Sequence, residues 1–239
     1  MDQRVNHKIA IMQPYIFPYL GYFQLIEAVN TFVFYDDVNF IKRGWINRNR
    51  ILLGGKEHMF TVPLIKASQN KLINETKVQK NSNWIAPFLT TLKQAYHKAA
   101  YYDDTMALVE SIVNAPHVTI ADLAINSVIK ISDHIKLTRI FELSSIQYFD
   151  TKGESKADRL ISITLKNGCN HYINPAGGIE LYDKAYFLDK GVKLSFIENE
   201  LVPYSQFNYD TFLGLSIIDI LMFNSTEKIR EMLKNYKLI

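Results

Sequence analysis

The spacing of apolar and polar residues at the start of the chain predicts two buried strands joined by a turn and a short helix. Residues 8–12 form a short apolar run, and residues 31–35 are β-branched and aromatic, which is typical of strands. Polar Gln13, two prolines and Gly21 separate the first run from a helix expected at 22–30. Strand, turn, helix and strand in this order predict a βαβ unit and therefore a parallel sheet.

The middle of the chain changes to helical spacing. The glycine pair Gly54-Gly55 predicts a hairpin whose second strand runs from about residue 58 to 64. Three helices are then expected, because apolar residues recur every three or four positions and Thr119 precedes the last stripe as an N-cap. We therefore expect a mainly helical insertion at about 83–135.

The second half returns to alternating strands and helices. Asn224 with Glu227 resembles a capping pair at the start of the last helix. The expected strands are 138–143, 171–174 and 192–197, and the expected helices are 157–166, 181–188, 213–223 and 225–236. The sequence thus predicts an α/β fold with a mostly parallel sheet and flanking helices, opened by a Rossmann-like or nucleotidyltransferase-like βαβ unit, in a single domain spanning 1–239.

Composition narrows the class of protein. With 239 residues, 48% hydrophobic and 21% charged, the chain can bury a sizeable core, which argues against wholesale disorder. The single cysteine, Cys169, excludes an intrachain disulfide framework and a Cys-rich zinc module, and the histidines lack metal-ligand spacing, so no metal site is predicted. The N-terminus lacks the pattern of a signal peptide, and no window approaches about 18 uninterrupted apolar residues. We therefore expect a cytoplasmic protein without a membrane span.

The formal net charge of +3 is concentrated in one stretch. Between Ile41 and Lys56 there are five cations and no acidic residue, so the rest of the chain carries 22 cations against 24 anions. A dedicated nucleic-acid binder is usually far more basic, which makes DNA an unexpected partner. A local site for a nucleotide or sugar phosphate explains one compact patch better.

The turn after the first strand is the first candidate site. Two prolines keep the segment out of a helix, and Gly21 permits close approach of the backbone to a ligand. The turn follows the carboxyl end of a parallel strand, where ligands bind, and the amides of a helix N-terminus hold phosphates there. Gln13, Tyr15, Gly21 and Tyr22 are the predicted ligand contacts, and a rigid structural turn is the alternative.

Asp36 and Asp37 follow the second strand and are the predicted catalytic residues. Adjacent carboxylates on an extended chain point to opposite sides, so we expect one of them to face the site. That carboxylate could serve as a general base, a ribose contact or a Mg²⁺ ligand. The alternative is a capping or turn aspartate that accepts hydrogen bonds from backbone amides.

The basic segment is the third candidate. Arginine forks match phosphate or carboxylate oxygens, asparagine both donates and accepts, and tryptophan stacks on a base or sugar. If the segment is extended, its tryptophan and asparagines share one face. The predicted substrate-binding residues here are Lys42, Arg43, Trp45, Asn47, Arg48, Asn49 and Arg50, and a solvated basic loop is the alternative.

A weaker signal is the glycine pair Gly177-Gly178, which follows an expected strand and Pro175. Two glycines permit close approach of the backbone to a ligand, so both are predicted substrate contacts. The segment has neither a dinucleotide-binding fingerprint nor a Walker lysine, and a plain turn explains it equally well.

Three ordered motifs resemble the WbqC-like family of bacterial proteins, which are often encoded among surface-polysaccharide (O-antigen) genes. They are Gln13-Pro14-Tyr15 with Pro18 and Gly21-Tyr22, then Val33–Val38, then Lys42-Arg43 with Trp45 and Asn47–Ile51. Many members have histidine before the Gln-Pro pair, where this chain has Met12, so a mechanism that needs an imidazole at that point does not transfer.

The resemblance implies acyl or aminoacyl transfer, including glycyl transfer, to the amine of a nucleotide-linked amino sugar. Its donor would be a free amino acid with ATP and Mg²⁺, or a charged tRNA. A non-catalytic protein that binds nucleotide sugar or tRNA is one alternative. A nucleotidyltransferase is another, since Gly21 stands where such enzymes have the glycine of H-x-G-H, although tyrosines replace the histidines.

Overall fold

A computed structural model describes residues 7–79, 83–207, 209 and 211–239. Within these residues a six-stranded sheet has the order β5-β2-β1-β6-β7-β8, in which the first five strands are parallel and β8 is antiparallel to β7. The strands are β1 Lys8–Met12, β2 Thr31–Phe34, β5 Ile140–Leu143, β6 His171–Pro175, β7 Lys193–Asn199 and β8 Tyr236–Leu238. A separate antiparallel hairpin pairs β3 (Arg48–Leu53) with β4 (Lys56–Thr61). The α/β fold with a mostly parallel sheet is confirmed.

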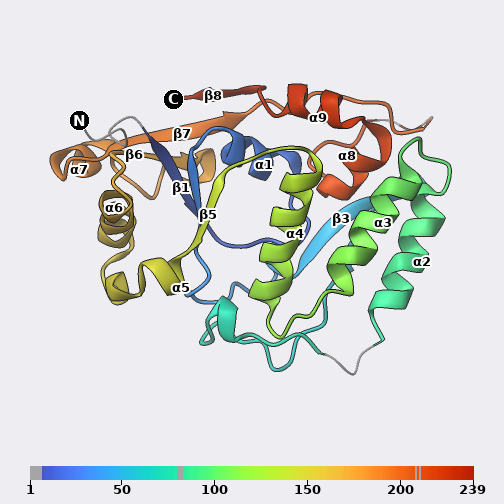
Figure 1. Cartoon of the computed structure of the whole chain (residues 1–239), viewed down its shortest axis with the longest axis horizontal. Helices are drawn as coiled ribbons and strands as arrows, with labels where there is room; N and C mark the ends of the chain where they lie inside the picture. Colours follow the sequence, from blue (N-terminus) through green and yellow to red (C-terminus); the bar gives the residue numbers. More distant parts are fainter. Residues whose placement is uncertain (1–6, 80–82, 208, 210) are drawn as a thin grey trace.

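Helices cover both faces of the sheet (Figure 1). One face packs against α1, α4, α8 and α9, and the other packs against α6 and α7. The helices are α1 Leu20–Glu27, α2 Ile85–Tyr96, α3 Tyr102–Val113, α4 Ile120–His134, α5 Ser144–Gln147, α6 Lys156–Lys166, α7 Lys184–Asp189, α8 Ile217–Phe223 and α9 Thr226–Met232. Because both faces are covered, successive residues of β1 are buried in different cores, with Ile9 and Ile11 on one side and Ala10 on the other.

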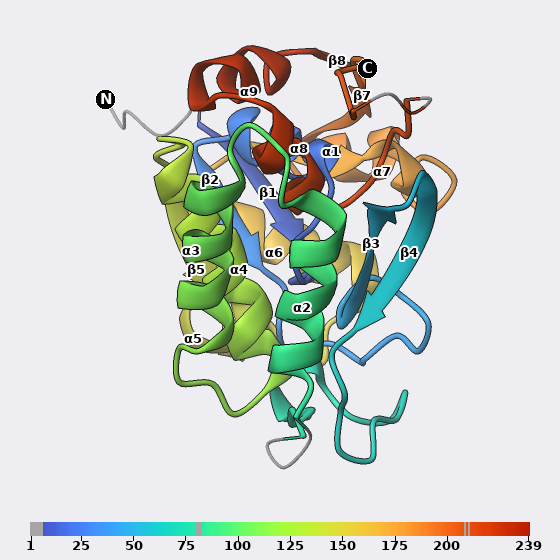
Figure 2. The same cartoon turned by 90° about the vertical axis from the view of Figure 1, so that its right-hand side faces the viewer.

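The helical insertion lies between β4 and β5, as the sequence predicts, and comprises α2, α3 and α4. Thr119 caps α4, because its side chain accepts a hydrogen bond from the backbone amide of Asp122. Figure 2 shows α2 beside the β3–β4 hairpin, and α2 also packs on α3. The insertion therefore supports the hairpin that carries the basic segment, while the division of the chain into domains stays a prediction.

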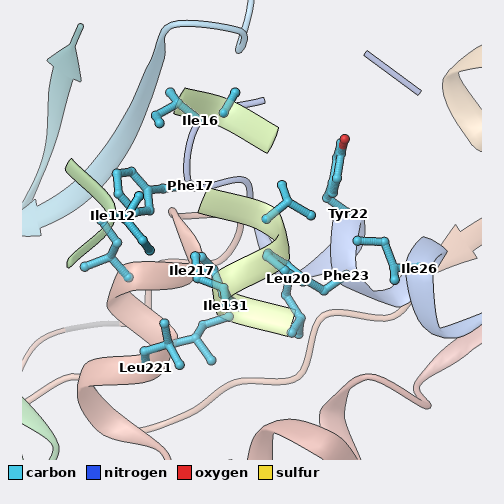
Figure 3. Packing of buried hydrophobic residues seen from close by; sticks show 14 of the residues in the cluster. Ile16, Phe17, Leu20, Tyr22, Phe23, Ile26, Ile112, Ile131, Ile217 and Leu221 are labelled. Atoms are coloured by element: carbon cyan, nitrogen blue, oxygen red, sulfur yellow. The ribbon is translucent and has the colours of Figure 1, made fainter. Parts of the chain in front are cut away.

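The turn after β1 is anchored in the main core. Ile16 and Phe17 are fully buried, and Figure 3 shows them close to Ile112, Ile131 and Ile217 from α3, α4 and α8. The turn therefore packs against helices that are far from it in the sequence. Its backbone conformation is consequently set by packing as well as by its two prolines.

Several predicted boundaries near the C-terminus are wrong. The helix expected from residue 213 begins at Ile217, because Gly214 has a positive φ of 74° and the Ser216 side chain caps the helix. Ser225, not Asn224, caps α9 by accepting a hydrogen bond from the amide of Lys228. The last predicted helix is also too long, since the chain turns after Met232 to form β8.

A buried carboxylate joins three parts of the fold. Asp219 of α8 is fully buried and accepts hydrogen bonds from the hydroxyls of Tyr96 (2.6 Å) and Tyr204 (2.5 Å) and from the Gln206 amide (2.6 Å). The Tyr96 hydroxyl in turn accepts from the backbone amide of Leu52 in β3. Burial raises the pKa of Asp219 above its usual range, and no cation forms an ion pair with it among the described residues.

The raised pKa gives the stability of the protein a defined pH dependence. A carboxyl whose pKa is raised on folding contributes stability while it is protonated, and this contribution is lost as pH rises through the raised pKa. Urea denaturation from acidic to neutral pH should therefore show the wild type losing stability relative to Asp219→Asn as pH rises. Asp150→Asn serves as control, because a hydrogen bond from Lys166 lowers the pKa of Asp150 and the relative slope should reverse. Equal slopes for the two variants would contradict this account.

Candidate functional site

The strand order creates a switch point between β1 and β6. From β1 the chain continues to β2 and then β5 on one side, and it returns to β6 on the other side of β1. In open parallel sheets ligands bind at the carboxyl ends of the strands at such a point. A pocket of about 400 Å³ lies there, lined by Met12 at the end of β1, Pro175 at the end of β6 and Asn199 at the end of β7.

Three segments that the sequence singles out separately meet in this pocket, which we call the tyrosine pocket. The predicted site residues that line it are Tyr15, Gly21, Tyr22, Trp45, Asn49, Arg50 and Gly177. The other lining residues are Met12, Pro18, Tyr19, Leu25, Pro175, Ile197, Asn199, Leu201 and Gly214. The predicted site residues outside the lining are Gln13, Asp36, Asp37, Lys42, Arg43, Asn47, Arg48 and Gly178.

Hydrogen bonds from Asn49 join the basic segment to the turn after β1, residues 13–22, which we call the proline turn. Its buried side-chain amide donates hydrogen bonds to the backbone carbonyls of Ile16 (3.2 Å) and Phe17 (2.8 Å). The amide of Ile16 donates to the carbonyl of Ile46, and the Ser216 hydroxyl donates to the Phe17 carbonyl. The turn is thus held from two sides, and Phe17 adopts a left-handed φ of 42° there.

Gly21 allows the start of α1 to lie against the pocket wall. A Cβ at this position would come within 2.3 Å of the Tyr19 ring and 2.9 Å of the Asn199 side chain. The Asn199 amide also donates to the carbonyl of Gly21 at 3.2 Å. Gln13 contributes through its backbone, because the Tyr22 hydroxyl donates to its carbonyl at 2.9 Å.

Arg50 carries the charge of the pocket, because the described lining contains no other ionisable group except tyrosine. Its guanidinium donates to Glu57 (2.8 Å) and to the carbonyl of Gly214 (3.4 Å), and it lies 5.2 Å from the centre of the Trp45 ring. Its Nε is buried and has no hydrogen-bond partner. A buried donor without a partner costs free energy, and a ligand can reach only the exposed part of the side chain, which is 29% of its surface.

The tyrosine hydroxyls of the pocket are proton donors at neutral pH. Burial, together with the nearby Tyr19, raises the pKa of Tyr15 to about 12, and burial also raises the pKa of Tyr19. The Tyr19 hydroxyl lies 3.5 Å from the Asn199 side-chain oxygen. Neutral hydroxyls and aromatic faces are suited to sugar and nucleobase groups rather than to proton abstraction.

The rest of the basic segment lies at the rim or supports it. Only Arg48 onward is a strand, so the predicted shared face of Trp45, Asn47 and Asn49 is not formed by one extended run. The Arg48 guanidinium donates to the carbonyls of Gly44 (3.1 Å) and Arg43, closing a tight loop in which Arg43 has a left-handed φ of 60°. The Asn47 amide donates to the carbonyl of Val62 in the neighbouring chain segment.

Lys42 and Arg43 form the exposed part of that loop. Neither side chain makes a hydrogen bond or an ion pair within the described residues. Trp45 of the same loop lines the tyrosine pocket, whereas Lys42 and Arg43 lie outside its lining.

The aspartate pair is buried away from the pocket lining. Asp36 accepts hydrogen bonds from Asn74 (3.2 Å) and from the backbone amide (3.0 Å) and hydroxyl (2.6 Å) of Ser145. The Ser144 hydroxyl lies 2.5 Å from Asp37 and 3.1 Å from Asp36. The expected opposite orientation of the two carboxylates is therefore wrong, because β2 ends at Phe34 and the chain bends at Asp37.

Sequence reasoning missed Arg159 of α6. Its guanidinium forms a buried ion pair with Asp37 at 2.6 Å, donates to Thr151 and lies 4.8 Å from the Tyr35 ring centre. The two partners are 122 residues apart, so no local spacing could reveal the pair. A catalytic role for Asp36 or Asp37 stays a prediction. In the structure both carboxylates are buried and accept hydrogen bonds just after the end of β2.

The two glycines after β6 have different surroundings. Gly177 lines the tyrosine pocket, and a Cβ there would meet no atom within 4 Å. At Gly178 a Cβ would lie 1.8 Å from the side-chain nitrogen of Asn174. The close approach at Gly178 is therefore made by the protein's own asparagine, and a ligand contact at Gly178 stays a prediction.

Within the part of the chain that is described, no group of three or more His, Cys, Asp or Glu side chains is placed to hold a metal ion. Across the same residues, no helix has the length and apolar character that crossing a bilayer requires.

Comparison with known proteins is consistent with this arrangement of motifs. A family model described as the WbqC-like protein family matches residues 13–231. The chain is also similar to the uncharacterized protein Rv1507c of Mycobacterium tuberculosis strain H37Rv, with 26% identity over 223 residues, which cover 90% of this chain and 92% of that relative. No solved structure gives a significant match.

Removing one partner of the buried Asp37–Arg159 pair should strongly destabilise the protein. Asp37→Asn leaves a buried guanidinium without its counter-charge, which typically costs about 3–5 kcal/mol of unfolding free energy. Adding Arg159→Met should recover part of the loss, because no unpaired buried charge then remains. Urea denaturation measures both effects, and Asp150→Asn, which breaks an exposed pair with Lys166, should cost much less. A loss for Asp37→Asn no larger than that of this control would contradict the buried pair.

Proposed function

Because the chain belongs to the WbqC-like protein family, we propose that the tyrosine pocket binds a nucleotide-activated amino sugar in surface-polysaccharide (O-antigen) biosynthesis. The bound sugar would then receive an acyl or aminoacyl group, such as glycyl, on its amine. The donor would be a free amino acid with ATP and Mg²⁺, or a charged tRNA. This work would take place in the cytoplasm, where nucleotide sugars and ATP are found.

The observation that carries the proposal is Arg50 in an otherwise uncharged aromatic pocket. Its side chain is 29% exposed, and the guanidinium lies 5.2 Å from the centre of the Trp45 ring, which offers a phosphate contact beside a platform for a base or sugar. No described carboxylate lines the pocket to repel a diphosphate. The first turn of α1, which includes Gly21, adds backbone amides at the carboxyl end of β1.

The transfer would form an amide bond between the sugar nitrogen and the acyl carbon and break the bond from that carbon to its leaving group. The amine must be neutral to attack, and its proton would leave with the departing group or through solvent. Lys42 and Arg43 at the rim would hold the anionic part of the donor. Gly177 would let the backbone after β6 approach the sugar closely.

One observation favours a second candidate function, binding without catalysis. The described lining contains no aspartate, glutamate or histidine, and the pKa of Tyr15 is about 12, so the pocket lacks a group that would accept a proton at neutral pH. A protein that delivers or senses a nucleotide sugar needs only the pocket. No comparable observation favours the nucleotidyltransferase.

Two measurements separate these functions. Calorimetric titration with UDP- and dTDP-linked amino sugars tests the pocket, and mass spectrometry of the same sugars with ATP and amino acids, or with charged tRNA, tests the transfer. A new amide product supports the enzyme, whereas sugar binding without any product supports the binding protein. If none of these sugars binds, both functions are wrong.

Arg50→Gln is the direct test of the phosphate contact. Hydrogen bonds to charged groups contribute about 1.5–3 kcal/mol, so the affinity for the tightest-binding nucleotide sugar should fall about 10- to 100-fold. Lys56→Gln is the matched control, because it removes an exposed cation from the same hairpin outside the pocket lining. Equal losses in the two variants would indicate general charge attraction and would exclude a specific role for Arg50.

A further inference from the structure

A second, smaller pocket lies at the opposite edge of the sheet, where the parallel strands begin. We call it the basal pocket; its volume is about 80 Å³, and its described lining is Glu27, Lys136, Leu137, Arg139, Arg230, Leu233 and Lys234. These residues come from the end of α1, the connection between α4 and β5, and α9 with the residue pair after it. None of them lines the tyrosine pocket.

The cations of the basal pocket outnumber the carboxylates beside it. Arg139 is fully engaged, because it donates to the side chain of Glu27 at 2.7 Å and to the carbonyls of Glu27 and Thr138. This pair neutralises the one acidic residue of the lining. The side chains of Lys136, Arg230 and Lys234 make no hydrogen bond or ion pair within the described residues.

Two of these cations, Lys136 and Arg230, act on the same carboxylate, that of Glu227. Hydrogen bonds from its own backbone amide and from Ser225, and then the charges of Lys136 and Arg230, lower the pKa of Glu227. Lys136 and Arg230 therefore lie within Coulomb range of one carboxylate although 94 positions separate them in the sequence. Even with Glu227 counted, four cations face two carboxylates, and like charges so close together repel one another.

The backbone at Lys136 is a second, independent sign of a site. Lys136 has a left-handed φ of 56°, and the amides of Lys136 and Leu137 donate to the carbonyls of Asp133 and Ser132. This pattern closes the end of α4 at a position where glycine is strongly preferred. A lysine in this conformation is strained, and strained residues are enriched at functional sites.

From these observations we propose that the basal pocket binds a phosphate group of a small molecule through Lys136, Arg230 and Lys234. Its size suits a single phosphate better than a sugar or base. A larger, shallow pocket of about 590 Å³ shares Glu27 and Arg139 with it and adds Lys8, Asn30 and Tyr236, which gives the rest of such a ligand room. The site is independent of the proposed function, since the two linings share no residue.

Inorganic pyrophosphate is the probe, and its effect on the melting temperature is the measurement. A ligand that binds only the folded state at concentration c raises its stability by RT ln(1 + c/Kd), so the shift grows with the logarithm of the ligand concentration. We expect millimolar pyrophosphate to raise the Tm of the wild type, and we expect the double variant Arg230→Gln/Lys234→Gln to weaken its binding at least about tenfold.

Three further variants make the test specific. Lys136→Gly should also lose the pyrophosphate response but be more stable without it, because glycine relieves the left-handed strain. Lys228→Gln, on the same helix but paired with Glu231 outside the lining, should keep the response. All variants are compared in the Arg50→Gln background, because the tyrosine pocket would otherwise bind pyrophosphate through Arg50. No shift in Arg50→Gln itself, or a shift that Arg230→Gln/Lys234→Gln leaves unchanged in that background, would overturn the proposal.

Discussion

The two hydrogen bonds from the Asn49 side chain to the carbonyls of Ile16 and Phe17 are the contact on which the tyrosine pocket depends. They join the proline turn after β1 to the first strand of the basic hairpin, and both groups are buried. Asn49 sits one residue before Arg50, so the same contact fixes where the guanidinium lies. The side-chain oxygen of Asn49 accepts a hydrogen bond from the amide of Arg50, so both polar atoms of this side chain have partners within the protein. Asn49 thus shapes the pocket through its contacts to the protein.

The loop before α8 completes this assembly. The Ser216 amide donates to the carbonyl of Arg50, and Gly214 lines the pocket and accepts from the Arg50 guanidinium. Asp219, one turn further along, ties α8 to Tyr204 and Gln206 of the segment that follows β7. The pocket wall and the buried Asp219 carboxylate therefore belong to one connected set of contacts. The polar groups in it can be buried because each has a hydrogen-bond partner.

Much of the fold and part of the site follow from local sequence patterns. The βαβ start, the basic hairpin and the helical insertion were predictable because their signals are short-range: apolar spacing, prolines and glycine pairs. The positions of Tyr15 and Gly21 in the pocket lining were predictable because both follow the carboxyl end of a parallel strand, and that of Arg50 was predictable from the charge of the basic segment.

What could not be predicted depends on partners far apart in the sequence. Asp37 was predicted to have a catalytic or capping role, and only the tertiary fold brings Arg159 to it. Asn199 carries no local signal, and its role appears only when β7 lies beside β6 at the pocket. The last predicted helix ran on to Tyr236, the first residue of β8, because a three-residue strand is too short for its spacing to distinguish it from a helix.

The central claim is that Asn49 holds the proline turn in place, and hydrogen exchange of the backbone tests it without any ligand. Asn49→Leu keeps the size of the side chain and removes both donors, a loss of about 2 kcal/mol at roughly 1 kcal/mol per bond. Measured by mass spectrometry, amide exchange in residues 13–22 should rise by about tenfold or more, with exchange in α6 unchanged. Unchanged exchange in the turn of a folded variant would contradict the claim.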